Sequence, residues 1–192
     1  MDLRAGDALL VADIQNDFLP GGALGVACGD EVVPVLIRYM SSFSQRGLPV
    51  FVSRDWHPPN HCSFREQGGI WPTHCVAGSK GAEFHPDFRL PPSATIISKA
   101  TDPGKEAYSA FEGTDLDKRL REAGVRRLFI GGLATDYCVL NTVRDAVQHG
   151  YAVVLLVDGI RAVNLHPDDG RKAEEEMLRL GTVSIRYESL PA

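Results

Sequence analysis

Six short apolar runs rich in β-branched residues recur along the chain, separated by longer segments of mixed polarity. The runs are 8–12, 49–52, 94–97, 128–130, 153–157 and 183–185. None of them alternates apolar with polar positions, and this is the pattern of strands buried on both faces of a parallel sheet. The runs therefore predict six short strands in the interior of an α/β protein.

Amphipathic stripes with helical spacing lie between several of these runs. The stripes are 32–43, 116–120, 139–147 and 173–180, followed in turn by Gly47, Gly124, Gly150 and Gly181. A glycine just past an apolar stripe is typical of a helix C-terminus. The alternation of strands and helices predicts one α/β domain over 1–192, a doubly wound, mainly parallel six-stranded sheet with helices on both faces.

Composition and charge narrow the class of protein. The chain has 192 residues, is 44% hydrophobic and 23% charged, and carries a formal net charge of -5. With no cluster of Lys and Arg we expect no nucleic-acid partner, and the apolar runs are too short to span a membrane. Asp13 interrupts the N-terminal apolar run too early for a signal peptide, and the 4 cysteines form no CxxC pair. We therefore expect a reduced, cytoplasmic protein.

Four chemically active side chains stand at the ends of predicted strands. Asp13 follows the first strand, Asp55 the second and Lys99 the third, and Cys138 follows the fourth and opens the next helix. Ligands of open α/β sheets bind at the carboxyl ends of the strands, so these residues should converge there. Asp13, Lys99 and Cys138 would supply a general base, a cation and a nucleophile. Taken singly, Asp13 could be a turn residue and Lys99 a solvated strand end.

Cys138 has the surroundings of a nucleophile. It follows a glycine-containing turn at 131–137 and precedes the apolar stripe of a helix. A helix N-terminus favours the thiolate and offers free amides to an oxyanion. The alternative is an inert buried cysteine, which is the common fate of a free Cys.

A second cluster lies in a long stretch rich in Pro, Gly and His that runs from 55 to 92. Stretches of this length inside a compact domain are usually functional. Asp55 and His57 are two residues apart, so in extended chain they point the same way, and His74 completes a carboxylate and imidazole set suited to a catalytic divalent metal. The alternative is a polar loop whose histidines cap turns. Cys62 and Cys75 lack the spacing of a thiolate zinc site, and His85, His149 and His166 are assigned to the surface or to turns.

These residues also carry a resemblance to a known family. Four segments look like the successive signatures of nicotinamidases, within the isochorismatase-like cysteine hydrolase superfamily: Asp-Ile-Gln-Asn-Asp-Phe at 13–18, Arg-Asp-Trp-His-Pro at 54–58, Trp-Pro-Thr-His-Cys at 71–75 and Thr-Asp-Tyr-Cys-Val at 135–139. Tyr-Ser-Ala-Phe at 108–111 resembles a further family segment. The metal motifs are the sharper part of the match, because isochorismatases and carbamoyl-sarcosine amidases generally lack them.

The resemblance implies roles for individual residues. Asp13, Lys99 and Cys138 would form a catalytic triad, with the amides of Ala134 and Cys138 as the oxyanion hole and a cis peptide between Leu133 and Ala134. Asp55, His57 and His74 would hold one divalent ion per chain, zinc in preference to iron or manganese, and the ion would bind the ring nitrogen of the substrate. The substrate pocket would be walled by Phe18 and Trp71, with Tyr108 and Tyr137 near its rim. His61 matches a histidine that is a metal ligand in some relatives and a supporting residue in others.

The resemblance implies hydrolysis of nicotinamide to nicotinate and ammonia through a Cys thioester, with pyrazinamide as a second substrate. Three alternatives stay open at this point. The chain could be another isochorismatase-like amidohydrolase, a metallohydrolase in which Cys138 is incidental, or a non-catalytic module that binds a metal or ligand. The expected partner is a small molecule, and the sequence leaves the oligomeric state open, a homo-oligomer included.

Overall fold

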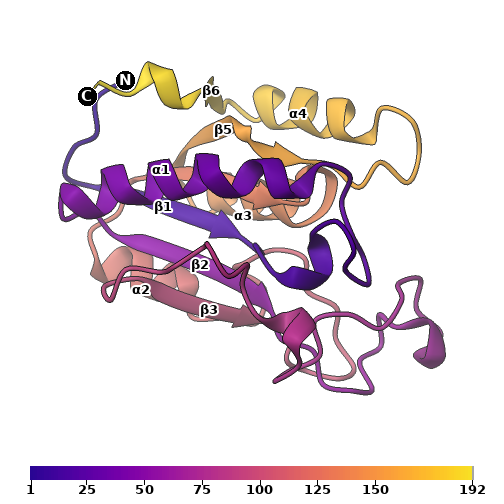
Figure 1. Ribbon diagram of the computed structural model, residues 1–192. Helices are drawn as coiled ribbons and strands as arrows, with labels where there is room; N and C mark the ends of the chain where they lie inside the picture. The colour runs from indigo at the N-terminus through magenta and orange to yellow at the C-terminus, as the bar shows by residue number, and fades with distance from the viewer. Residues whose placement is uncertain (192) are drawn as a thin grey trace.

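A computed structural model of the protein, which describes residues 1–191, contains one sheet of six strands that all run parallel (Figure 1). The strands are β1 (Asp7–Ala12), β2 (Val50–Asp55), β3 (Thr95–Lys99), β4 (Arg127–Leu133), β5 (Ala152–Arg161) and β6 (Val183–Ile185). Their order across the sheet is β3-β2-β1-β4-β5-β6, so the chain reverses its direction of winding after β3. The predicted fold class is confirmed.

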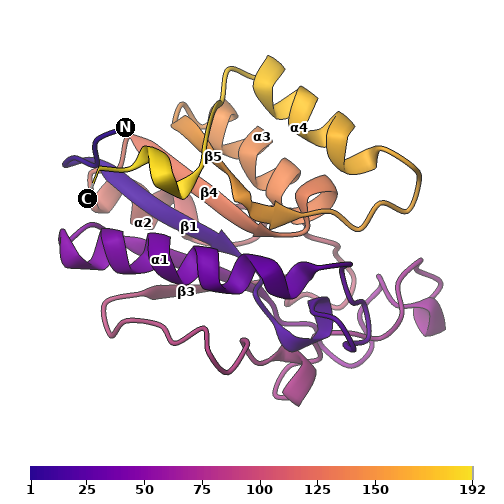
Figure 2. The same ribbon diagram turned by 45° about the horizontal axis from the view of Figure 1, so that its top comes forward.

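Four α-helices cover the two faces of the sheet (Figure 2). They are α1 (Val32–Gln45), α2 (Leu116–Glu122), α3 (Leu140–Gln148) and α4 (Asp169–Arg179). Helix α1 packs on one face and the other three helices pack on the opposite face. Within residues 1–191 no helix has both the length and the hydrophobicity that a membrane span requires.

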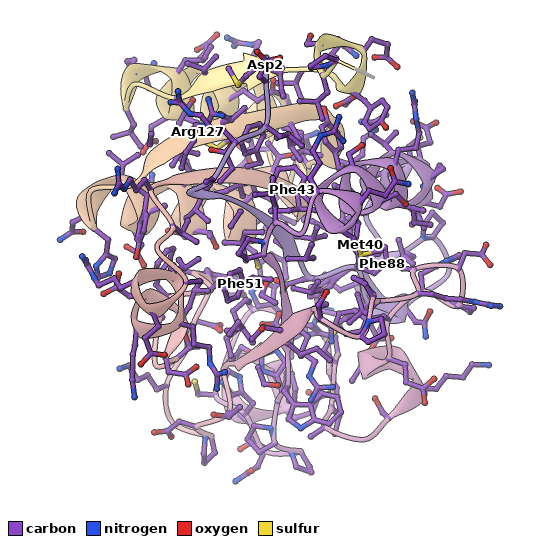
Figure 3. The ribbon with its side chains drawn as sticks, turned by 90° about the vertical axis from the view of Figure 1, so that its left-hand side faces the viewer. Asp2, Met40, Phe43, Phe51, Phe88 and Arg127 are labelled. Atoms are coloured by element: carbon purple, nitrogen blue, oxygen red, sulfur yellow. The ribbon has the colours of Figure 1, made fainter. Side chains whose placement is uncertain are left out.

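The apolar runs supply both cores because successive side chains of a strand point to opposite faces. Leu9 of β1 faces α1 whereas Leu10 faces the other helices, and both side chains are fully buried. Figure 3 shows the same division, with Phe43 of α1 on one side of the sheet and Phe51 of β2 on the other. This double burial accounts for strands that lack polar alternation.

Several strands are longer than the apolar runs that predict them. Strand β2 continues to Asp55 and β3 continues to Lys99, where the two residues pair across the ladder. Strand β5 extends to Arg161, past an irregularity in its register with β4. In β2 and β3 the backbone ladder continues where the apolar pattern stops, because Asp55 and Lys99 at their ends face a polar site rather than the core.

The segment between β2 and β3 extends beyond the carboxyl ends of these strands (Figure 1). It carries two short 3₁₀ turns, Arg65–Gln67 and Lys80–Ala82. Isolated bridges tie Gln15 to Phe84 and His57 to Val76, so the segment is anchored to the ends of β1 and β2. The metal motifs of the sequence lie in this segment.

Candidate active site

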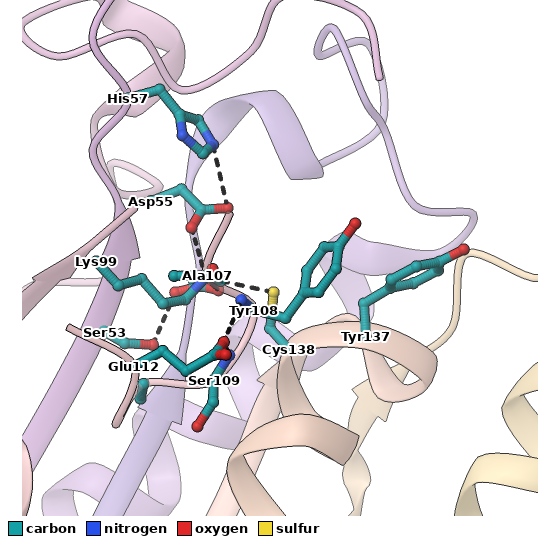
Figure 4. Close-up of polar contacts among 12 residues, drawn as sticks. Ser53, Asp55, His57, Lys99, Ala107, Tyr108, Ser109, Glu112, Tyr137 and Cys138 are labelled. Atoms are coloured by element: carbon teal, nitrogen blue, oxygen red, sulfur yellow. Dashed lines mark hydrogen bonds and ion pairs between the residues drawn. The ribbon is translucent and has the colours of Figure 1, made fainter. Parts of the chain in front are cut away.

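Three strand ends and one helical turn bring the predicted catalytic residues together (Figure 4). Asp55 and Lys99 are the last residues of β2 and β3, and Asp13 directly follows β1. Asp13 has a φ of +50°, a left-handed conformation that is uncommon outside glycine, and its amide donates to the Ser53 carbonyl. Backbone strain of this kind is found mainly at functional sites.

Cys138 lies in a single π-helical turn, Thr135–Val139, that leads into α3. The turn follows β4 at a point where the chain passes very close to β1. A Cβ at Gly132, whose φ is +124°, would lie 2.1 Å from the Ala12 carbonyl oxygen, so only glycine fits. The Leu133–Ala134 peptide is cis, which confirms the expectation from the family pattern. The close approach brings Cys138 next to the residue that follows β1.

Lys99 is the centre of the catalytic cluster. Its Nζ lies 3.2 Å from Asp13 Oδ2 and 3.5 Å from Cys138 Sγ, and it donates hydrogen bonds to Asp55 Oδ1 and, at 3.3 Å, to the Ala107 carbonyl. Ser53 Oγ donates to the other Asp13 oxygen, Oδ1, at 2.7 Å. All of these side chains are buried. A buried ammonium between two carboxylates is paired and hydrogen-bonded, as a buried charge must be.

Burial and the charges around Cys138 act together on the pKa of its thiol. Burial raises the pKa of the thiol well above its ordinary value, and the neighbouring carboxylates add to this effect against the opposing charge of Lys99. Burial thus opposes the expected stabilisation of the thiolate by the helix N-terminus, and the raised pKa favours the protonated thiol. Burial also raises the pKa of Asp13, although Lys99 opposes the shift. A carboxylate with a raised pKa is a stronger base, so Asp13 is suited to take the thiol proton.

Two further shifts fix the charges of Asp55 and Lys99. Burial alone would raise the pKa of Asp55, but the positive charge of Lys99, followed by interactions with His57, lowers it below its ordinary value. Burial alone would lower the pKa of Lys99, and the carboxylates of Asp13 and Asp55 raise it well above its ordinary value. Lys99 and Asp55 are therefore both charged at neutral pH.

The predicted metal ligands lie together on the other side of Asp55. One donor atom each from Asp55, His57 and His74 falls within 4.8 Å of the other two, and all three residues are buried. Asp55 uses Oδ1 for Lys99, while its Oδ2 lies 3.6 Å from His57 Nε2. His74 Nδ1 donates to the Pro72 carbonyl at 2.7 Å, which leaves Nε2 without a proton and free to bind an ion.

His57 provides the physical test of whether a metal fits this site. Its side chain is buried, and neither ring nitrogen has a hydrogen-bond partner within residues 1–191. An unpaired buried polar group is costly, and coordination to a divalent ion would remove that cost. Burial also lowers the pKa of His74, which favours the neutral ring that a metal needs. The carboxylate and imidazole set therefore fits a divalent metal such as zinc.

His61 supports this cluster rather than completing it. Its Nδ1 is hydrogen-bonded to Ser63 Oγ at 2.8 Å and its Nε2 to the Lys105 carbonyl at 3.1 Å, so both ring nitrogens are occupied. The ring packs against His57 with a centroid distance of 4.2 Å. We therefore place His61 behind His57, a role that the sequence left open.

A pocket opens above Cys138 and the metal ligands. Ala134 lines this pocket. Its walls also include the four aromatic residues that were predicted to bind substrate, Phe18, Trp71, Tyr108 and Tyr137. Trp71 Nε1 donates to Tyr108 Oη at 2.9 Å, which joins two loops at the wall of the pocket. Asp13 and Lys99 do not line the pocket and lie beneath it.

Three residues of the pocket wall were missed by the sequence analysis: Leu24, Glu106 and Val163. Leu24 and Val163 lie in loops, where no periodic pattern marks a residue as inward-facing. Glu106 stands two residues before Tyr108, and an acidic residue beside that family segment was the one signal that could have identified it.

Comparisons with known proteins place this arrangement in a family. The Isochorismatase domain family matches residues 7–186, and the chain belongs to this family. It is 42% identical to the nicotinamidase of Escherichia coli over 91% of this chain and 92% of the relative.

Solved structures give the same result. The fold is similar to pyrazinamidase of Pyrococcus horikoshii in complex with zinc, with a TM-score of 0.91, 50% identity and coverage of 95% of this chain and 99% of that one. It is also similar to PnC1 of L. infantum in complex with nicotinate, with a TM-score of 0.88, 36% identity and coverage of 98% and 96%. The family resemblance identified in the sequence is confirmed.

Proposed function

We propose that this protein is a nicotinamidase, which hydrolyses nicotinamide to nicotinate and ammonia and also accepts pyrazinamide. The similarity to proteins named nicotinamidase and pyrazinamidase extends over nearly the whole chain and supports this activity. One structural observation supports the assignment of this activity to particular residues. A buried Asp13, Lys99 and Cys138 cluster and a buried Asp55, His57 and His74 donor set meet at a single aromatic pocket.

The first half of the reaction forms a thioester. Asp13 takes the proton of Cys138, and the thiolate attacks the carboxamide carbon of the bound substrate. Lys99, which lies within 3.5 Å of both reacting side chains, stabilises the negative charge that passes between them. The backbone amides of Ala134 and Cys138 are the proposed donors to the oxyanion. The carbon–nitrogen bond then breaks, and ammonia leaves with the proton held by Asp13.

The second half releases the acid. Asp13, a carboxylate again, takes a proton from a water molecule as the water attacks the thioester carbon. The carbon–sulfur bond breaks, the proton returns from Asp13 to Cys138, and nicotinic acid leaves and loses its remaining proton to solvent to give nicotinate. Ser53 holds Asp13 Oδ1 throughout, so Oδ2 is the oxygen that carries the proton in both halves.

Asp55, His57 and His74 would hold one divalent ion, with zinc favoured over iron or manganese. When bound, the ion supplies a Lewis-acid contact for the ring nitrogen of the substrate. The same Asp55 carboxylate hydrogen-bonds to Lys99, so one residue links substrate orientation to the catalytic cluster. Phe18, Trp71, Tyr108 and Tyr137 would enclose the aromatic ring.

The proposal places the reaction in the cytoplasm. All four cysteines are free, and two of them, Cys75 and Cys138, are buried as unpaired thiols. Cysteines that all remain unpaired are typical of proteins in a reducing compartment.

An ammonia-release assay tests the function. The purified protein should release one ammonia for each nicotinate formed from nicotinamide, and Cys138→Ala should abolish this while Cys62→Ala, the matched control, retains it. Activity that survives Cys138→Ala would favour the metallohydrolase alternative. Absence of activity in wild-type protein that holds its metal would favour another amide substrate or a non-catalytic module.

A further inference from the structure

Asp136 stands two residues before Cys138 in the π-helical turn, yet its side chain does not line the pocket. The carboxylate instead binds the loop that follows β5. Its Oδ1 accepts a hydrogen bond from the Val163 amide at 2.9 Å, and its Oδ2 accepts one from the Asn164 amide at 2.8 Å. Hydrogen bonds to a charged acceptor are stronger than neutral ones, so both oxygens of one carboxylate hold two adjacent peptide groups.

The loop held by Asp136 forms part of the substrate pocket. Val163 lines the pocket and packs against the core cluster that contains Phe18 and Ala134. The residues after it, from Asn164 to Asp168, are exposed and bury no apolar side chain that could fix the loop. The chain that follows Val163 is therefore held mainly by polar contacts.

Asn164, the residue after Val163, is held at both its backbone and its side chain. Asn164 has a φ of +53°, and its side-chain Oδ1 accepts a hydrogen bond from the Gly170 amide in the first turn of α4 at 2.8 Å. Asn adopts the left-handed region more readily than most residues, and hydrogen bonds fix the conformation at this position. Here the determinants are the bond from the Asn164 amide to Asp136 and the bond from its side chain to Gly170.

We infer that Asp136 is a positioning residue that holds Val163 against the ring of an aromatic carboxamide substrate. The turn that contains Cys138 thereby also fixes one wall of the substrate pocket, through Asp136 and Val163. Asp136 acts on binding and not on the chemical step, because it contacts neither the pocket nor the catalytic cluster. The substrate in this inference rests on the proposed function.

Steady-state kinetics with nicotinamide test the role. Asp136→Ala should raise KM roughly tenfold, the effect of losing one well-packed aliphatic contact, and leave kcat within about twofold. Asp136→Asn, which retains one acceptor oxygen, should lie between this variant and wild type. Asp145→Ala, a matched control that removes a carboxylate from α3 with no hydrogen bond of its own among the described residues, should leave both constants unchanged.

A double-mutant cycle with Val163 separates positioning from general stabilisation. If Asp136 acts through Val163, the double variant Asp136→Ala/Val163→Ala should have the KM of the Val163→Ala variant, because the wall is already lost. Additive effects on KM, or a fall in kcat with KM unchanged, would overturn the inference. A lower melting temperature with unaltered kinetics would also overturn it, since that is what a purely structural residue gives.

Amide hydrogen exchange tests the two hydrogen bonds from the Val163 and Asn164 amides to Asp136 without any substrate. The Val163 and Asn164 amides should exchange much faster in Asp136→Ala than in wild type or in Asp145→Ala. Unchanged exchange would overturn the inference whatever the substrate. If wild-type protein fails to hydrolyse nicotinamide but exchange is faster in the variant, the proposed function is overturned. The role of Asp136 in holding the loop would still be established.

Discussion

Replacing Lys99 by Met should abolish activity and also remove much of the stability of the fold. Lys99 is 1% exposed, lies 3.2 Å from Asp13 Oδ2 and hydrogen-bonds to Asp55. Met has a similar length and no charge, so Lys99→Met leaves two carboxylates buried without their cation. Removal of one partner from a buried ion pair costs about 3–5 kcal/mol.

This cost translates into a large change in melting temperature. For a chain of this size each kcal/mol corresponds to about 2–4 °C, so the melting temperature should fall by roughly 6–20 °C. Lys118→Met is the matched control, because its side chain is 75% exposed and its distance to Glu122 is 3.9 Å. An exposed pair contributes at most about 1 kcal/mol, and the control should melt within a few degrees of wild type.

Thermal unfolding of Lys99→Met and of the double variant Lys99→Met/Asp13→Asn completes the experiment. Neutralising Asp13 removes one of the two uncompensated charges, so the double variant should regain part of the lost stability and none of the activity. The reasoning is refuted if Lys99→Met melts with wild type, or if it retains near-normal release of ammonia from nicotinamide.

Three further outcomes are expected. Elemental analysis of the purified protein should find about one divalent ion per chain. The His74→Ala variant should lose this ion, whereas His61→Ala should keep most of it. Full activity in strong chelator would contradict the metal site. Values of kcat/KM should be high for nicotinamide and pyrazinamide and as much as roughly 10⁴-fold lower for benzamide, which lacks the ring nitrogen; equal values would remove the metal from substrate recognition. Gly132→Ala should lower the free energy of unfolding by more than about 2 kcal/mol, because its Cβ would lie 2.1 Å from the Ala12 oxygen. Gly150→Ala meets no atom within 4 Å and should cost only about 1 kcal/mol for its positive φ, so similar losses in both variants would contradict the steric argument.

The sequence predicts the sheet and the catalytic cluster because both follow from local patterns. Unbroken apolar runs indicate strands buried on both faces, and parallel strands place their carboxyl ends at one edge. Asp13, Asp55 and Lys99 are found together for that reason alone. The lengths of β2 and β3 could not be predicted in the same way. Their last residues are polar, and the backbone pairing that keeps these residues in the sheet joins segments far apart in the sequence.

Other parts of the site depend on contacts between distant segments, which no local pattern reports. His61 Nε2 donates a hydrogen bond to the carbonyl of Lys105, a residue 44 positions away, and only Nδ1 bonds to a near neighbour, Ser63. Val163 lines the pocket because Asp136 holds its loop. The pKa of the Cys138 thiol likewise depends on burial and on the carboxylates of Asp13 and Asp55, which come from other strands.

The most direct test of the account is detection of the covalent intermediate. Wild-type protein mixed with nicotinamide and quenched in acid during turnover should show, by intact-mass spectrometry, a fraction of chains that carry one nicotinoyl group, and peptide mapping should place the group on Cys138. Asp13→Asn, which lacks the base that activates both thiol and water, should show no such species. A nicotinoyl group on Cys28, Cys62 or Cys75, or its absence from wild-type protein during single-turnover quenches that capture ammonia release, would contradict nucleophilic catalysis by Cys138.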